Sequence, residues 1–327
     1  MAACTPSRWT ARCTASAAAE VATYGDPTTE AHMLFEGVIP AALTPFDRSG
    51  RVDTDALSAT ADQLIEEGAG GLVGTGTMGE AQSLSAAERR LVIETLVRAA
   101  DGRVRITAGV SSESPAASIG YAADAALAGA EALMLLPSLG YGGDAREIEA
   151  FYAAVAAATD LPIMAYNNPK ASGTDMRPDL IARLAEIDGV VAVKECSGDA
   201  RRIAEIINAV GERLEVLVGG DDWALEGFCA GATGWVSGVV NVAPRECIEL
   251  YRLCREGRLE EARAVYARLL PLGRLDMKPK LVQYFKAAMD LVGRTGGPCR
   301  PPRLELTADE HREVEDAVRA LRAEVAP

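Results

Sequence analysis

The residues Gly189-Val190-Val191-Ala192-Val193-Lys194 form a short apolar run that ends in a lysine, and the fold follows from repetition of this pattern. Similar runs of Val, Ile, Leu and Ala recur roughly every 20–33 residues. Between them apolar residues are spaced i, i+3, i+4, as in Ala56–Leu64, which predicts amphipathic helices. Apolar strands flanked by helices are typical of a parallel sheet covered on both faces. The eight predicted strands are Val38–Leu43, Gly71–Gly74, Val104–Gly109, Ala132–Leu136, Leu161–Tyr166, Val190–Lys194, Leu214–Val218 and Thr233–Ser237.

Eight strand–helix units predict an α/β fold, a closed (β/α)8 or TIM barrel. The alternative is an open doubly wound sheet, which usually has a GxGxxG turn after its first strand. Here the first run ends in Leu43-Thr44-Pro45-Phe46, so we favour the barrel. After Pro244 the alternation stops, and a C-terminal helical extension is predicted, with helices near 245–256, 259–270, 278–292 and 307–323.

The predicted domain organisation has three parts. Residues 1–34 form a disordered leader, because Ala, Thr, Ser and Arg dominate and no helical period is present. A transit peptide, or a start at Met33, are alternatives for this segment. Residues 35–256 form the barrel, and residues 257–327 form a helical annex.

Composition excludes several classes of function. The net charge of −14 argues against a nucleic-acid partner or an anionic membrane surface. No apolar run reaches the roughly 20 residues of a membrane span. The chain has two histidines, His32 and His311, which argues against a serine triad or a metal site with histidine ligands. We therefore expect no metal and no cofactor. Seven cysteines without CxxC spacing are typical of reduced thiols and predict a cytoplasmic location.

Candidate site residues lie where the predicted strands end, because barrel active sites form at the carboxyl ends of strands. Lys194 is the strongest candidate. The chain has five lysines, and only Lys170 and Lys194 fall within the barrel. A period of two places Val190, Ala192 and Lys194 on one face of the strand. If this face is the barrel interior, desolvation lowers the pKa of the lysine and leaves a nucleophilic amine. The alternative is a lysine paired with a carboxylate at the barrel rim.

Other strand ends supply possible partners for this lysine. Tyr166 ends the preceding strand and could shuttle protons, although a core tyrosine is an equal alternative. The turn Gly76–Glu80 offers Thr77 and backbone N–H groups to a carboxylate, or is a plain tight turn. Gly219-Gly220 could instead cradle a phosphate. The further residues expected to contact substrate are Thr44, Met78, Gly79, Gly220, Ser237 and Gly238.

Taken in order, these pieces resemble the dihydrodipicolinate synthase/N-acetylneuraminate lyase family of Schiff-base barrels. The resemblance covers Phe35 to about Leu321. It implies that Lys194 forms the Schiff base, that Tyr166 shuttles protons, and that Thr77 with the Met78 N–H holds the substrate carboxylate. The matching segments are Gly37–Phe46, Thr77-Met78-Gly79-Glu80, Leu84-Ser85, Tyr166-Asn167-Asn168-Pro169, Val193-Lys194-Glu195, Gly220-Asp221-Asp222, Asn241 and Arg300-Pro301-Pro302.

Departures from the family pattern bear on the substrate. Dihydrodipicolinate synthases usually have an arginine five residues beyond the tyrosine, and Ala171 stands there. They also have a tyrosine pair after the proline that ends strand four, whereas Pro137 is followed by Ser138 and Leu139. These departures argue against a role in lysine biosynthesis.

Other segments are similar to 1-pyrroline-4-hydroxy-2-carboxylate deaminases of hydroxyproline breakdown, which release 2,5-dioxopentanoate and ammonia. We therefore expect a Schiff-base lyase or deaminase for a 2-oxo acid or its cyclic imine, and this deaminase is the favoured reaction. The segments are Lys194–Asp199, Arg201-Arg202, Gly234–Gly238 and Lys280–Tyr284.

Four alternatives remain open. They are a 2-keto-3-deoxy sugar acid aldolase or dehydratase, a dihydrodipicolinate synthase, a keto-acid-binding sensor barrel without catalysis, and a phosphate-binding barrel isomerase that uses Gly219-Gly220. The resemblance also implies a homotetramer.

Overall fold

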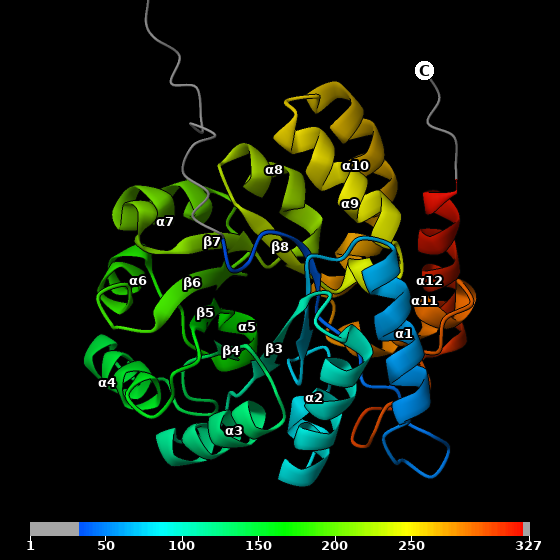
Figure 1. Cartoon of the computed structure of the whole chain (residues 1–327). Coiled ribbons are helices and arrows are strands. Elements are labelled where there is room, and N and C mark those ends of the chain that lie inside the picture. Colours follow the sequence, from blue (N-terminus) through cyan, green and yellow to red (C-terminus); the bar gives the residue numbers. More distant parts are fainter. Residues whose placement is uncertain (1–32, 323–327) are drawn as a thin grey trace, which may run out of the picture. The chain divides into compact units, whose positions relative to one another are not determined.

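Eight parallel strands form the centre of the computed structural model, which describes residues 33–322, and the helices lie outside the strands (Figure 1). The strands are β1 (Gly37–Pro40), β2 (Gly71–Gly74), β3 (Arg105–Gly109), β4 (Ala132–Leu135), β5 (Ile163–Asn167), β6 (Val190–Glu195), β7 (Glu215–Val218) and β8 (Gly234–Ser237). The helices up to β8 are α1 (Thr54–Glu66), α2 (Ala86–Ala100), α3 (Pro115–Leu127), α4 (Ala145–Ala156), α5 (Pro169–Ser172), α6 (Pro178–Leu184), α7 (Arg201–Val210) and α8 (Ala224–Cys229). After β8 follow α9 (Pro244–Arg255), α10 (Leu259–Gly273), α11 (Leu281–Leu291) and α12 (Ala308–Leu321).

The sheet closes on itself. Its strand order is β1-β8-β7-β6-β5-β4-β3-β2, so β1 and β2 are the two ends that must meet. They do so through a parallel bridge between Ala41 and Val73 and through hydrogen bonds from Ala42 N to Val73 O and from Gly70 N to Val38 O, each 2.9 Å long. The predicted barrel with C-terminal helices is confirmed.

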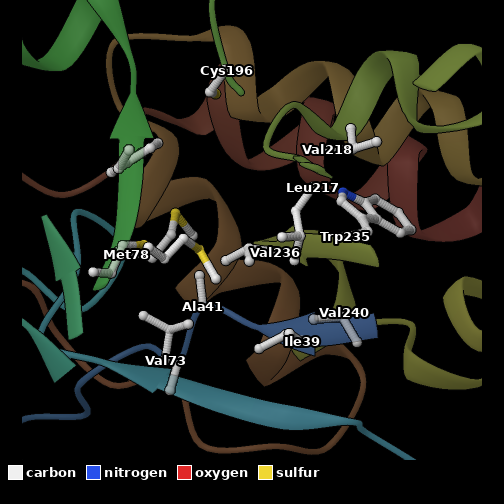
Figure 2. Close-up of a cluster of buried hydrophobic side chains, with 14 of the residues drawn as sticks. Ile39, Ala41, Val73, Met78, Cys196, Leu217, Val218, Trp235, Val236 and Val240 are labelled. Atoms are coloured by element: carbon white, nitrogen blue, oxygen red, sulfur yellow. The ribbon is translucent and has the colours of Figure 1, made fainter. Parts of the chain in front are cut away.

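Aliphatic side chains fill the interior of the barrel. Figure 2 shows Ile39, Val73 and Val236, which come from β1, β2 and β8, grouped near Ala41. All four are buried. Short aliphatic side chains pack densely within a ring of this size. The low aromatic content of the chain, 5%, agrees with an interior filled by aliphatic side chains.

Three predicted boundaries differ from the observed ones by three residues, and the other predicted strand and helix ends differ by at most two. β1 ends at Pro40 and not at Leu43, because the chain turns so that the Thr44 hydroxyl donates to Gly79 O at 2.8 Å. α11 begins at Leu281 and not at 278, because Pro279 holds Lys278 in an extended conformation, with ψ 153°. α10 extends to Gly273 and includes Pro271 within its last turn.

The start of the described chain is attached to the barrel. The backbone N–H groups of Leu34 and Phe35 donate to the two carboxylate oxygens of Glu215 on β7, at 2.6 and 2.7 Å. The predicted leader, residues 1–34, lies almost entirely outside the described residues. From Leu34 onward the described chain forms one compact unit, and the predicted division at 256 stays a prediction. None of the helices within 33–322 combines the length and the apolar character needed to cross a membrane.

Candidate active site

Lys194 and Tyr166 occupy paired positions on neighbouring strands. The parallel register of β5 and β6 sets Tyr166 directly beside Lys194. Side chains at paired positions point to the same face of a sheet, so the amine and the phenol are directed together. The Lys194 Nζ lies 4.3 Å from the centroid of the Tyr166 ring.

The surroundings of Lys194 favour an uncharged amine. Its side chain is 5% exposed, and within the described residues it takes part in no ion pair. Burial lowers the pKa of Lys194, while Cys196, Asp276 and Asp221 oppose that shift. The alternative of a lysine paired with a carboxylate at the barrel rim therefore does not describe this side chain. A buried amine with a lowered pKa has the properties of a nucleophile.

Gly219 provides the space in which Lys194 lies. A Cβ atom at position 219 would be 2.9 Å from the Cε of Lys194 and 2.7 Å from Glu195 O. The N–H of Gly219 donates to Glu195 O at 2.7 Å, so it is not free for a phosphate. The neighbouring Gly220 lies against the Trp223 ring, where an added Cβ would be 2.0 Å from Nε1. These two glycines serve close packing in the structure.

The Tyr166 phenol is held in place near the turn that follows β2. Asn168 Nδ2 donates to the phenol oxygen at 2.7 Å. Burial raises the pKa of Tyr166 well above its usual value, and nearby Cys196 adds to this shift. The phenol is therefore protonated at neutral pH. Thr77 Oγ1 is buried without a hydrogen-bond partner in the described part of the chain.

The turn between β2 and α2 has an unusual backbone. Thr75 and Glu80, which flank it, have positive φ angles of 53° and 54°. Such values are uncommon for residues other than glycine and are often found at functional sites. Within the described residues, the N–H groups of Thr77 and Met78 donate no hydrogen bond. Successive free N–H groups in a turn form a cradle for an anion such as a carboxylate.

A cavity of about 430 Å³ opens at the carboxyl ends of the strands. Five of the nine residues predicted to act on or contact the substrate line it. They are Thr77, Met78, Tyr166, Lys194 and Gly238.

The other four predicted contact residues are not on the wall of this cavity. Thr44 and Gly79 are hydrogen-bonded to each other. Ser237 is buried and accepts a hydrogen bond from Val240 N at 3.2 Å. Gly220 packs on Trp223, as described above. Their observed contacts position the loops around the cavity.

Several residues on the cavity wall were missed by the sequence analysis. Asp276, Met277 and Lys278 belong to the segment between α10 and α11, and Arg303 follows α11. A search of strand ends cannot find them, because they come from the C-terminal helical extension. The one signal in the sequence is Asp276 itself, a carboxylate in the otherwise apolar stretch Leu275-Asp276-Met277.

Comparisons with known proteins identify the family. The model of the dihydrodipicolinate synthetase family matches residues 34–321. The chain belongs to this family. It is 36% identical over 289 residues to the 4-hydroxy-tetrahydrodipicolinate synthase of Methanothrix thermoacetophila, covering 87% of this chain and 96% of the relative. The protein of the same name from Archaeoglobus fulgidus is 35% identical over 88% of this chain and 99% of its own.

Solved structures of the dihydrodipicolinate synthetase family have the same architecture. The crystal structure of dihydrodipicolinate synthase from Aquifex aeolicus has a TM-score of 0.84 and 29% identity, covering 88% of this chain and 98% of that one. Membership in this family makes the protein an enzyme, a class I lyase that works through a lysine Schiff base. Within residues 33–322, no cluster of His, Cys, Asp and Glu side chains could hold a metal ion.

Proposed function

We propose that Lys194 forms a Schiff base with C2 of a 2-oxo acid or of its cyclic imine, and that Tyr166 moves the protons. The observation that carries this proposal is the buried Nζ of Lys194, 4.3 Å from the Tyr166 ring centroid on the wall of one cavity. An amine kept neutral by burial attacks a carbonyl carbon, and a protonated phenol beside it donates to the carbonyl oxygen, which becomes the carbinolamine hydroxyl and later leaves as water.

The turn after β2 supports a role in holding the substrate. A 2-oxo acid carries its carboxylate next to the carbon that Lys194 attacks. The free N–H groups of Thr77 and Met78, with the unpartnered Thr77 hydroxyl, offer three donors on the cavity wall. Donors aimed at a carboxylate orient the substrate before bond formation, which lowers the entropic part of the barrier.

Once the protonated imine forms, it acts as an electron sink. Loss of a proton from C3 then gives an enamine, and no organic cofactor is needed for this step. The enamine carbon can attack an aldehyde, or the enamine can expel a hydroxyl group from C4. Both reactions would use Lys194 and Tyr166 of this chain in the same roles.

The first candidate reaction is that of a 4-hydroxy-tetrahydrodipicolinate synthase, in which pyruvate condenses with aspartate semialdehyde. The names of the two relatives above support it. Lys170 adds a further argument. It lines the cavity next to Ala171, its Nζ is 3.4 Å from Met277 Sδ, and it makes no ion pair with a described residue. It therefore offers a cation to a second carboxylate where the family arginine is absent.

The second candidate is the 1-pyrroline-4-hydroxy-2-carboxylate deaminase of hydroxyproline degradation. The specific observation in its favour is that Ala171 lines the cavity where synthases have an arginine, and that Ser138 and Leu139 replace their tyrosine pair. A cyclic imine carries one carboxylate, so it needs no second cationic partner. Ring opening on Lys194, loss of the C4 hydroxyl and hydrolysis would release 2,5-dioxopentanoate and ammonia.

Borohydride trapping tests the shared step. The protein is incubated with pyruvate and sodium borohydride, and the modified peptide is located by mass spectrometry. We expect a reduced pyruvate adduct on Lys194, absent from Lys194→Ala and retained in Lys280→Ala, whose lysine pairs with Glu310 away from the cavity. The proposal would be contradicted if neither pyruvate nor the cyclic imine formed an adduct on the protein.

Turnover assays then separate the reactions. Consumption of pyruvate only with aspartate semialdehyde present indicates the synthase, whereas release of ammonia from 1-pyrroline-4-hydroxy-2-carboxylate indicates the deaminase. Turnover of a 2-keto-3-deoxy sugar acid would favour the aldolase or dehydratase. An adduct without turnover of any of these compounds would favour the sensor.

The homotetrameric state and the cytoplasmic location stay predictions from the family resemblance and the reduced cysteines. Sedimentation equilibrium of the purified chain would test the first, and cell fractionation the second.

A further inference from the structure

Asp276 is a carboxyl group on the wall of the candidate active-site cavity, within the 3-10 turn Arg274–Met277 that links α10 to α11. Among the described residues that line the cavity, it is the single acidic side chain. It makes no hydrogen bond or ion pair with a described side chain, whereas two nearby cations, Lys278 and Arg303, pair with Glu313 and Glu80. An unpartnered carboxyl that faces an open cavity is available to a ligand.

Both candidate reactions require a proton at one particular atom. When an enamine adds to an aldehyde, the aldehyde oxygen becomes a hydroxyl on C4 and must gain a proton. When the enamine expels a hydroxyl from C4, the leaving oxygen must also gain a proton. Ser138 and Leu139 stand where synthases have the tyrosine pair that relays protons. Tyr166 serves the carbinolamine at C2 in the proposed function, so the C4 oxygen needs another donor.

We propose that Asp276 is a catalytic residue that donates a proton to the oxygen on C4 of the Lys194-bound substrate. The inference rests on the proposed function, in that it requires the Schiff base on Lys194. In the elimination direction, the enamine electron pair moves to form the C3–C4 double bond while the C4–O bond breaks. The oxygen leaves with that bonding pair, takes the Asp276 proton and departs as water. In the addition direction, the enamine electron pair forms the C3–C4 bond, the carbonyl π pair moves to the oxygen, and the oxygen takes the same proton.

The charged groups around Asp276 are consistent with a protonated acid. Burial raises its pKa well above the usual value, and Asp221 and Asp222 on the 3-10 turn Asp221–Trp223 add to the shift. Lys194 on β6 and Lys170 on α5 oppose it. Tyr166 and Cys196 line the same cavity as Asp276. The pKa of each is raised first by burial and further by Asp276.

Asp276→Asn tests the assignment, because the amide keeps the shape of the side chain and cannot donate a proton to a leaving oxygen. Asp188→Asn is the matched control, since this exposed carboxyl lies just before the amino end of β6, makes no hydrogen bond or ion pair with a described residue, and is not on the cavity wall. Two activities are measured on each variant. The first is exchange of the pyruvate C3 protons in D2O with borohydride trapping on Lys194. The second is turnover of pyruvate with aspartate semialdehyde, and of 1-pyrroline-4-hydroxy-2-carboxylate.

We expect Asp276→Asn to keep exchange and trapping within about 3-fold of the unmodified chain while turnover falls about 100-fold or more. We also expect the turnover of the unmodified chain to decline as pH rises and the acid loses its proton, and this decline to be absent in the variant. Asp188→Asn should keep both activities.

Four results would overturn the assignment. The first is turnover by Asp276→Asn within about 3-fold of the unmodified chain, and the second is an equal loss of exchange and turnover in that variant. The third is an equal loss in Asp188→Asn, and the fourth is an unmodified chain that forms the pyruvate adduct but consumes neither probe. Absence of any adduct on Lys194 would instead show that the proposed function itself is wrong.

Discussion

The carboxylate of Glu80 and the ammonium group of Lys286 lie 2.7 Å apart, with side chains 0% and 2% exposed. Glu80 ends the turn that carries Thr77 and Met78, and Lys286 lies on α11. The same carboxylate accepts from the backbone N–H of Arg300 at 3.1 Å. This buried pair therefore joins the predicted carboxylate cradle to the C-terminal helices.

Loss of one partner of this pair should destabilise the protein strongly. Lys286→Met leaves the buried Glu80 carboxylate with only the partly exposed Arg303, at 3.3 Å, as its cation, and we expect the free energy of unfolding to fall by about 3 kcal/mol. Urea denaturation followed by circular dichroism measures it. Lys280→Met breaks the more exposed pair with Glu310 and should cost less than about 1 kcal/mol. Equal effects of the two substitutions would show that the buried pair contributes no more to the free energy of unfolding than the exposed pair.

The rate of trapping on Lys194 should depend on pH in a defined direction. Burial lowers the pKa of this lysine below 10.5, and only the deprotonated amine is nucleophilic. The initial rate of adduct formation with pyruvate should therefore rise with pH and level off before pH 10.5. A series of quenched reactions between about pH 6 and pH 11 gives this profile. A rate that still rises above 10.5 would indicate an amine with an ordinary pKa.

A methyl group at position 219 should displace Lys194 without removing it. The added Cβ of Gly219→Ala would lie 2.9 Å from Lys194 Cε and 2.8 Å from Cys196 Cβ. Because displacement of a reacting group by about 1 Å can cost about 100-fold in rate, we expect trapping to slow by about 10- to 100-fold. Gly120→Ala is the control, since apart from its chain neighbours and the backbone of its own helix nothing lies within 4 Å of the added Cβ. Unchanged trapping in Gly219→Ala would mean that Lys194 does not need this space.

The Glu88–Arg300 pair should make stability depend on acid pH. The Arg300 guanidinium is the largest cause that lowers the pKa of Glu88 to about 2, against an ordinary value of 4.5. A carboxyl with a lowered folded-state pKa stabilises the fold above its unfolded-state pKa and loses that contribution as pH falls through the folded-state pKa.

Glu88→Gln should therefore lower the free energy of unfolding by about 1–3 kcal/mol at pH 7. The difference from the unmodified chain should shrink between about pH 5 and pH 2. Chemical denaturation at several pH values measures both. A constant difference across that range would rule out the ion pair as its source.

Much of the candidate site could be predicted because its residues lie in short, regular elements. The apolar run Val190–Val193 predicts a buried strand, and a period of two then predicts the direction of Lys194. The same reasoning applied to β5 predicts Tyr166 at the end of the neighbouring strand. The parallel register then sets the two side chains beside each other.

Boundaries and contacts between distant segments could not be predicted in this way. The sequence does not show that Asp276, 82 residues after Lys194 in the numbering, lines the same cavity. Nor does it show that the predicted contact residues Thr44 and Gly79 are hydrogen-bonded to each other, with neither on the cavity wall.

The sequence by itself determined the repeated strand–helix pattern, the barrel and the Lys194–Tyr166 pair, because hydrophobic periodicity acts over a few residues and can be read locally. Only the tertiary structure decided which side chains share the cavity and which buried charges are paired. The pairing of Lys286 with Glu80, and the place of Asp276 on the same cavity wall as Lys194, depend on how α11 and the segment before it pack on the barrel. That packing is set by the summed burial of many side chains, and no short stretch of the sequence encodes it.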